Sequence, residues 1–140
     1  MPIDFLERCN AIEECYEYML AYAGQGLPSD AGNQAGSRIR DFLQRAAHTL
    51  SGIAASCADS LSDEGIQTLQ PYEKFISVLN RDAQDSLAAI LVVLAQPTIS
   101  SQLIDNLNAS IHLRALLTDL FLLGEVVRSR RLASVTLTHD

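Results

Sequence analysis

Residues 71–96 have the sequence PYEKFISVLNRDAQDSLAAILVVLAQ, and this stretch decides the fold class. Its apolar side chains recur every three or four residues from Tyr72 to Leu94, which is the period of an α-helix with one buried face. Pro71 suits the first position of a helix, and Pro97 ends it because the residue before a proline is pushed out of the α region. The stretch therefore predicts one long amphipathic helix.

Three other segments have the same apolar period and predict further helices. They span about Ile3–Ala23, a stretch from about Ser37 or earlier to Ala58, and the residues from Thr98 or Ser100 to about Arg131, with helix-weak residues at Asn106–Ser110 that could interrupt the last one. The expected connections are a loop over at least Gly24–Pro28, within the glycine-rich stretch to Ser37, a turn at Ser60–Gly65 and a short helical turn at Gly65–Leu69.

The end of the chain carries the one strand-like stretch, Val135–Thr138, and no other segment offers it a partner strand. We therefore expect an all-α protein. Residues 1–131 would form a single domain, an up-and-down bundle of four long helices with or without a short extra helix, and residues 132–140 a C-terminal tail.

Composition and charge exclude several classes of function. The chain has 140 residues with a net charge of −7 and one lysine against nine arginines, the latter ratio being typical of GC-rich bacterial coding. A protein that follows a phosphate backbone needs a basic face, so we expect no nucleic-acid partner. The longest apolar run, Leu87–Ala95, is far shorter than the ~20 residues that span a bilayer, so we expect no membrane partner.

Cysteine usage favours a reducing compartment. Cys9, Cys15 and Cys57 are odd in number and form no Cys-x-x-Cys motif, which makes a disulfide framework improbable. The first ten residues carry Asp4 and Glu7 and lack the basic start and apolar stretch of a signal peptide. We therefore expect a cytoplasmic protein.

Two segments are apolar on nearly every side of their helix, namely Leu87–Ala95 and Leu116–Leu123. Such segments are either the most central helices of the bundle or are covered by a second subunit. We expect a homo-oligomer, most simply a homodimer. The candidate interface residues are Leu91, Val92, Leu116, Asp119, Leu120 and Leu123.

Asp119 stands out because its neighbours in this run are almost all apolar. A buried carboxylate is costly unless it is paired. Asp119 would then lie either at an exposed edge of the helix or in an ion pair, with Arg114 or with an arginine of a second subunit, that defines the interface.

Catalytic and metal-binding signatures are sparse. No glycine-rich phosphate loop precedes a helix, and none of the three histidines lies in a Glu-x-x-His pattern or near a cysteine at zinc spacing. We therefore expect no cofactor and no metal site, and we favour a protein that is not an enzyme.

Of all the side chains, that of His48 is the clearest candidate for a chemical role. The apolar seam of its helix passes through Ala46, Leu50 and Ile53, which places the His48 side chain on the solvent side. An exposed histidine can carry a group covalently, although most exposed histidines have no such role.

The stretch Arg45-Ala46-Ala47-His48-Thr49-Leu50-Ser51-Gly52 resembles the signature of histidine-containing phosphotransfer domains. This resemblance implies a four-helix bundle that accepts a phosphoryl group on His48 from the aspartate of a response regulator. Gly52 matches the glycine of the family pattern, whereas Ser51 stands where the family has a lysine that neutralises phosphoryl charge. Arg45 is the cation in this stretch that could take over that role.

These observations lead to two functional hypotheses. The first is a non-enzymatic helical protein–protein interaction module, an adaptor, chaperone or regulator that works through its helical faces. The alternative is a phosphocarrier that uses His48, with Arg45, Ser51 and Gly52 around the phosphoryl group.

Overall fold

Six α-helices make up the described part of the chain. The computed structural model describes residues 4–66 and 70–138, with side chains up to residue 133. The helices are α1 (Phe5–Gly24), α2 (Gln34–Leu50), α3 (Ile53–Asp63), α4 (Gln70–Leu94), α5 (Ser101–Ala109) and α6 (Ile111–Thr138). They hold 83% of the described residues, among which no strand occurs, so the prediction of an all-α chain is confirmed.

Two of the four expected helices are each divided in two. The expected helix Ser37–Ala58 breaks at Ser51, which has an extended backbone, and Gly52, whose φ of 79° lies in the left-handed region that glycine tolerates. The expected fourth helix breaks at Ser110, within the segment Asn106–Ser110 that we expected to interrupt it. The Ser110 hydroxyl then accepts a hydrogen bond from the Leu113 amide (3.3 Å) and caps α6.

One helix start lies within the expected range, and one helix end does not. The helix α2 begins at Gln34, at the earlier of the expected starts, because the Asn33 side chain accepts a hydrogen bond from the Gly36 amide (2.5 Å). The helix α6 does not stop near Arg131 but continues to Thr138, since neither glycine nor proline follows Gly124 to end it. Much of the expected tail 132–140 is therefore helical. Residues 67–69 of the expected turn and residues 1–3 and 139–140 lie outside the described part.

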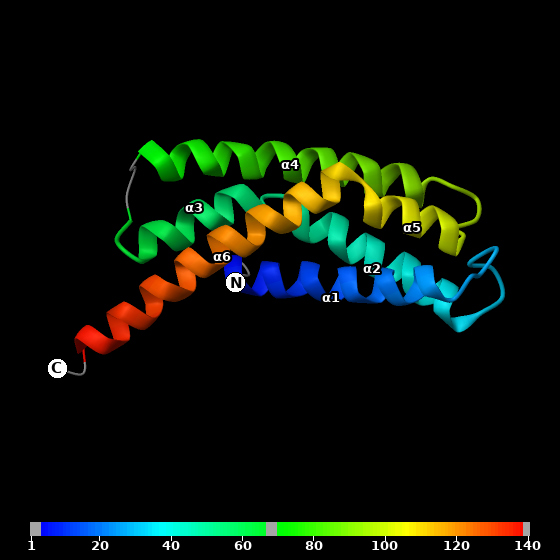
Figure 1. Cartoon of the computed structure of the whole chain (residues 1–140), viewed down its shortest axis with the longest axis horizontal. Helices are drawn as coiled ribbons and strands as arrows, with labels where there is room; N and C mark the ends of the chain where they lie inside the picture. The colour runs from blue at the N-terminus through cyan, green and yellow to red at the C-terminus, as the bar shows by residue number, and fades with distance from the viewer. Residues whose placement is uncertain (1–3, 67–69, 139–140) are drawn as a thin grey trace.

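The helices pack around one core (Figure 1). The helices α1 and α2 lie side by side, α4 runs along the opposite face, and α6 crosses the molecule obliquely so that it packs on both α4 and α1. The C-terminal part of α6 extends beyond the ends of the other helices (Figure 1).

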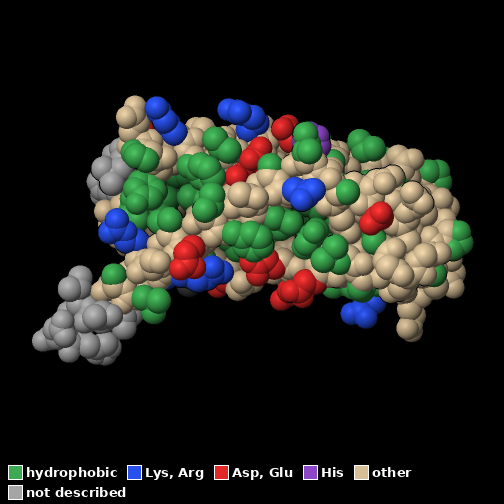
Figure 2. Space-filling model, viewed as in Figure 1, with side chains coloured by type: hydrophobic (Ala, Val, Ile, Leu, Met, Phe, Trp, Pro, Cys, Tyr) green, Lys and Arg blue, Asp and Glu red, His purple; other side chains and the backbone are tan. Residues whose placement is uncertain are grey.

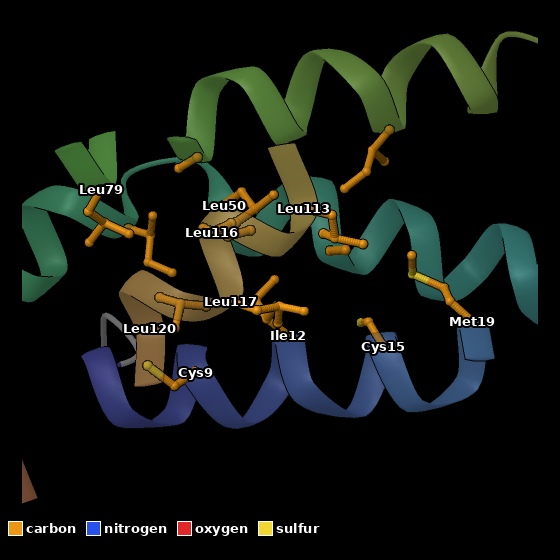
Figure 3. Close-up of a cluster of buried hydrophobic side chains, with 14 of the residues drawn as sticks. Cys9, Ile12, Cys15, Met19, Leu50, Leu79, Leu113, Leu116, Leu117 and Leu120 are labelled. Atoms are coloured by element: carbon orange, nitrogen blue, oxygen red, sulfur yellow. The ribbon is translucent and has the colours of Figure 1, made fainter. Parts of the chain in front are cut away.

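The centre of the core lies between α1 and α6 (Figure 3). Fully or almost fully buried side chains of α1 meet those of α6, and Leu50 and Leu79 join them from α2 and α4. The members labelled in Figure 3 are Cys9, Ile12, Cys15, Met19, Leu113, Leu116, Leu117 and Leu120. All three cysteines of the chain are buried and free. Burial raises the pKa of Cys9 and Cys57 to about 12 and that of Cys15 to about 11, so these thiols stay neutral.

Arginine side chains join the ends of helices that are distant in sequence. Arg40 of α2 forms an ion pair with Asp30 (2.5 Å) and donates hydrogen bonds to the carbonyls of Leu94, Gln96 and Pro97 at the end of α4. Cationic donors at this end of a helix satisfy carbonyls that lack a partner within the helix. The loop between α1 and α2 is thereby tied to the loop after α4.

Two further arginines act in the same way. Arg8 of α1 donates to the carbonyls of Thr49 (2.7 Å) and Ser51 (3.2 Å), where α2 ends. Arg131 of α6 binds Glu64 (2.9 Å) at the end of α3 and Asp4 (3.4 Å) at the start of α1. Arg131 therefore makes a contact that joins three helices.

Candidate functional site

His48 lies where the sequence predicted, on the exposed side of the last turn of α2. The two residues that complete the phosphotransfer-like stretch do not continue this helix. The Ser51 amide donates to the His48 carbonyl (3.3 Å) as α2 ends, and Gly52 turns the chain into α3. Ser51 and Gly52 are therefore near His48 in sequence but belong to the turn rather than to its helix.

Arg45, the cation nearest to His48 along α2, already has a partner within the chain. Its guanidinium forms an ion pair with Glu14 of α1 (3.1 Å), and both side chains are largely exposed. The neighbouring Arg8 directs one nitrogen to the carbonyls of Thr49 and Ser51. The structure thus brings two cations to this region, and both have partners within the chain.

The six residues expected at a subunit interface fall into two groups. Leu91 and Val92 of α4 are 51% and 64% exposed, as a surface role requires. The other four, Leu116, Asp119, Leu120 and Leu123, are buried inside the chain. The physical reason is that α6 runs obliquely across the molecule, so that α1 and α4 cover two of its sides. These four residues, predicted at an interface, therefore belong to the core of the chain.

Asp119 is buried rather than at an exposed edge, and the described residues of the chain include no arginine in an ion pair with it. Its neighbour is Asp82 of α4. Burial, which is the largest cause, together with a hydrogen bond to Asp82 and the charge of Asp82 raises the pKa of Asp119 to about 7. Ionised carboxylates only accept hydrogen bonds, so a hydrogen bond between the two requires that one carboxyl keeps its proton. Among the described residues Asp119 Oδ2 has no hydrogen-bond partner.

The exposed apolar side chains gather on α4 and α6. Of the seven large apolar residues that are exposed in the described part, six belong to these two helices. They are Leu91 and Val92 of α4 and Ile111, Phe121, Leu122 and Leu132 of α6. Phe121 and Leu122 were missed as candidates, although the spacing of Leu116, Leu120 and Leu123 along one face would have placed them on the opposite side.

A groove runs beside α6 where this helix diverges from the N-terminal half of α4. It has a volume of about 700 Å³ and is lined by Tyr72, Phe121, Leu122, Glu125, Val126, Arg128, Ser129 and Arg130. A second hollow of about 290 Å³ shares Tyr72 and reaches Leu61 and Ile76 between α3 and α4. Figure 2 shows hydrophobic side chains gathered on this part of the surface, with charged side chains around them.

A metal site and a membrane span are both absent from the described residues. No three histidine, cysteine or acidic side chains of the described residues lie close enough together to hold a metal ion. Likewise, none of the helices in the described ranges has the length and hydropathy to cross a membrane.

Comparison with known proteins yields no relative on which an assignment could rest. No protein-family model matches the chain, and neither the curated proteins nor the solved structures contain a significant match.

Proposed function

We propose that this chain is a non-enzymatic helical interaction module, an adaptor, chaperone or regulator that assembles with a second copy of itself. The observation that carries the proposal is the apolar surface of α6, where Phe121, Leu122 and Leu132 are between 54% and 69% exposed. Full burial of one such side chain contributes about 1.5–3 kcal/mol, so covering several of them favours association.

The groove beside α6 supports the same function. Its lining combines aromatic and aliphatic side chains, Tyr72, Phe121, Leu122 and Val126, with charged residues at the edge. An apolar centre with a polar rim is the usual anatomy of a protein interface. Leu91 and Val92 add a smaller exposed apolar surface on α4.

Sedimentation equilibrium tests this proposal directly. We expect the wild-type chain to be a dimer at tens of micromolar and Phe121→Glu to shift it toward the monomer, because the substitution places a charge where an apolar contact forms. Leu20→Glu is the matched control, since Leu20 is 48% exposed but lies on α1. Helical circular dichroism should be unchanged in both variants. A wild-type monomer at these concentrations would contradict the proposal.

A phosphocarrier role for His48 is the second candidate, and the observation in its favour is the exposed position of the imidazole. Incubation with a phosphorylated response regulator tests it. Acid-labile labelling of the wild type that His48→Gln abolishes would establish this role. We expect no labelling, because Ser51 stands in the place of the family's lysine and Arg45 is paired with Glu14.

We also expect His48→Gln to unfold within about 0.5 kcal/mol of the wild type, as exposed substitutions usually do. Chemical denaturation measures this difference. A loss of several kcal/mol would mean that the imidazole makes a contact essential to the fold.

A further inference from the structure

Four exposed residues form a stripe along α6, which we call the α6 stripe: Phe121, Glu125, Arg128 and Leu132. Their spacings of four, three and four residues place them on one face of the helix. Phe121 is 57% and Leu132 69% exposed, so both ends of the stripe are apolar surface. The order along the stripe is apolar, acidic, basic, apolar.

This order is self-complementary when the helix direction is reversed. Phe121 and Leu132 are equally far from the midpoint between Val126 and Val127, and so are Glu125 and Arg128. In two antiparallel helices related by a two-fold axis at that midpoint, the apolar ends oppose each other and each carboxylate opposes a guanidinium. Such an isologous contact uses the same patch on both subunits.

We propose that two copies of the chain dimerise through antiparallel α6 helices, with Glu125 of each copy paired to Arg128 of the other and Phe121 packed on Leu132. This inference rests on the proposed self-association and specifies its surface and geometry. A parallel pair in register would place Glu125 opposite Glu125 and Arg128 opposite Arg128, which like-charge repulsion disfavours.

The charges of the stripe are available for such a contact. In the described residues, Arg128 has no carboxylate within ion-pair distance, whereas Arg40 and Arg45 each have one and Arg131 has two. Among the residues with described side chains, the one that donates to the Glu125 carboxylate is Ser129, whose hydroxyl makes a long hydrogen bond (3.5 Å). An ion pair across the dimer therefore does not have to break one within the chain.

The shape of the molecule also suits a second helix at this place. After Val127, which is buried, Arg128, Arg130 and Leu132 are exposed, and the C-terminal part of α6 extends beyond the other helices (Figure 1). Phe121, Glu125 and Arg128 also line the groove of about 700 Å³ beside α6. Side chains of a partner helix can enter this groove without displacing the chain's own core.

Charge reversal provides the test, because each variant alone places like charges in both pairs. We expect Glu125→Arg and Arg128→Glu, measured separately by sedimentation equilibrium, to raise the dimer Kd by at least about tenfold. An equimolar mixture of the two variants should form heterodimers with a Kd near that of the wild type, since every pair is again opposite in charge. The double variant E125R/R128E should recover the homodimer for the same reason.

The matched control is Glu17→Arg on α1, which makes the same change of charge at an exposed site off α6. We expect its dimer Kd to stay within about twofold of the wild type. Circular dichroism of every variant shows whether it has folded.

The outcomes separate this inference from the proposed function. A wild-type dimer that both single reversals leave intact would overturn the α6 contact and keep self-association through another surface. Loss of the dimer in the single variants without recovery in the mixture would overturn the antiparallel pairing. A monomeric wild type would overturn the proposed function itself.

Discussion

At the scale of single residues, the contact between Asp82 and Asp119 is the least expected feature of the chain. Two carboxyls that meet at a buried position cannot both ionise without repulsion. Asp119 is 4% exposed, and its pKa of about 7 lies far above the value of ~3.9 expected in an unfolded chain. The pair therefore links the packing of α4 on α6 to pH.

The sign of this linkage follows from the two pKa values. Between about pH 4 and pH 7 the unfolded chain has lost the Asp119 proton while the folded chain retains it, so the free energy of unfolding falls as pH rises through this window. Above about pH 8 Asp119 is ionised in both states, and its contribution to the free energy of unfolding no longer changes with pH.

Asp119→Asn should remove the penalty of ionising this site. We expect the variant to be more stable than the wild type by about 1–3 kcal/mol at pH 8 and to lose most of that advantage at pH 4, given about 1.4 kcal/mol for each pKa unit. Urea denaturation at fixed protein concentration and several pH values measures the difference. Asp85→Asn, at an exposed site of α4, should show no such pH-dependent gain. Equal effects of both substitutions would contradict the role assigned to the pair.

At the scale of elements, the connection between α1 and α2 depends on a close approach of backbone segments. Gly36, in the first turn of α2, lies so near Asp30 that a Cβ atom would overlap the Asp30 backbone. Asp30 in turn binds Arg40 and accepts a hydrogen bond from the Ile99 amide (2.6 Å). Although burial opposes its ionisation, these hydrogen bonds hold the pKa of Asp30 below its ordinary value.

Gly36→Ala should therefore destabilise the chain by about 2 kcal/mol or more, because the whole connection has to shift. Gly24→Ala is the control, since no atom lies within 4 Å of the Cβ position at the end of α1. Alanine is the better helix former by up to ~1 kcal/mol, so this second change should be neutral or stabilising. Thermal unfolding of both variants measures the contrast, and a neutral Gly36→Ala would contradict the close approach.

Helix breaks were only partly predictable at this scale. Helix-weak residues indicated an interruption at Asn106–Ser110, and α6 indeed starts after Ser110. The break at Ser51 and Gly52 was not expected, because Ile53 and Cys57 continue the apolar spacing of α2. Both are fully buried after the turn as well, so the period of apolar residues alone does not reveal the bend.

At the scale of the whole molecule, two apolar segments that looked alike in sequence have different fates. In the run Leu87–Ala95 the outer residues Leu91 and Val92 face solvent, whereas most of the run Leu116–Leu123 is buried, with Leu120 only 2% exposed. In this second run only the outer side of α6, with Phe121 and Leu122, stays open, because the other sides pack on α1 and α4.

Substitution by glutamate distinguishes the buried Leu120 from the exposed Val92. We expect Leu120→Glu to lose the cooperative fold or several kcal/mol of stability, because it buries a charge without a partner. Val92→Glu, at a site 64% exposed, should retain the helical signal and unfold within about 0.5 kcal/mol of the wild type. Circular dichroism and denaturation measure both. A folded, stable Leu120→Glu would place this residue on the surface.

The sequence by itself determined the features that depend on neighbours along the chain. The three- to four-residue apolar period defined helices in all the expected segments, Pro97 ended one of them, and the seam through Ala46 and Leu50 placed His48 on the surface.

Only the tertiary structure decided which residues meet across helices. Asp82 and Asp119, Arg40 and the end of α4, and Arg131 with Asp4 and Glu64 are far apart in sequence, so no local pattern predicts their contact. The same holds for the outer side of α6, whose Phe121 and Leu122 are exposed while Leu120 and Leu123 are buried. The physical reason is that a helical period defines an apolar face, whereas the packing of other helices against α6 determines how much of that face is covered.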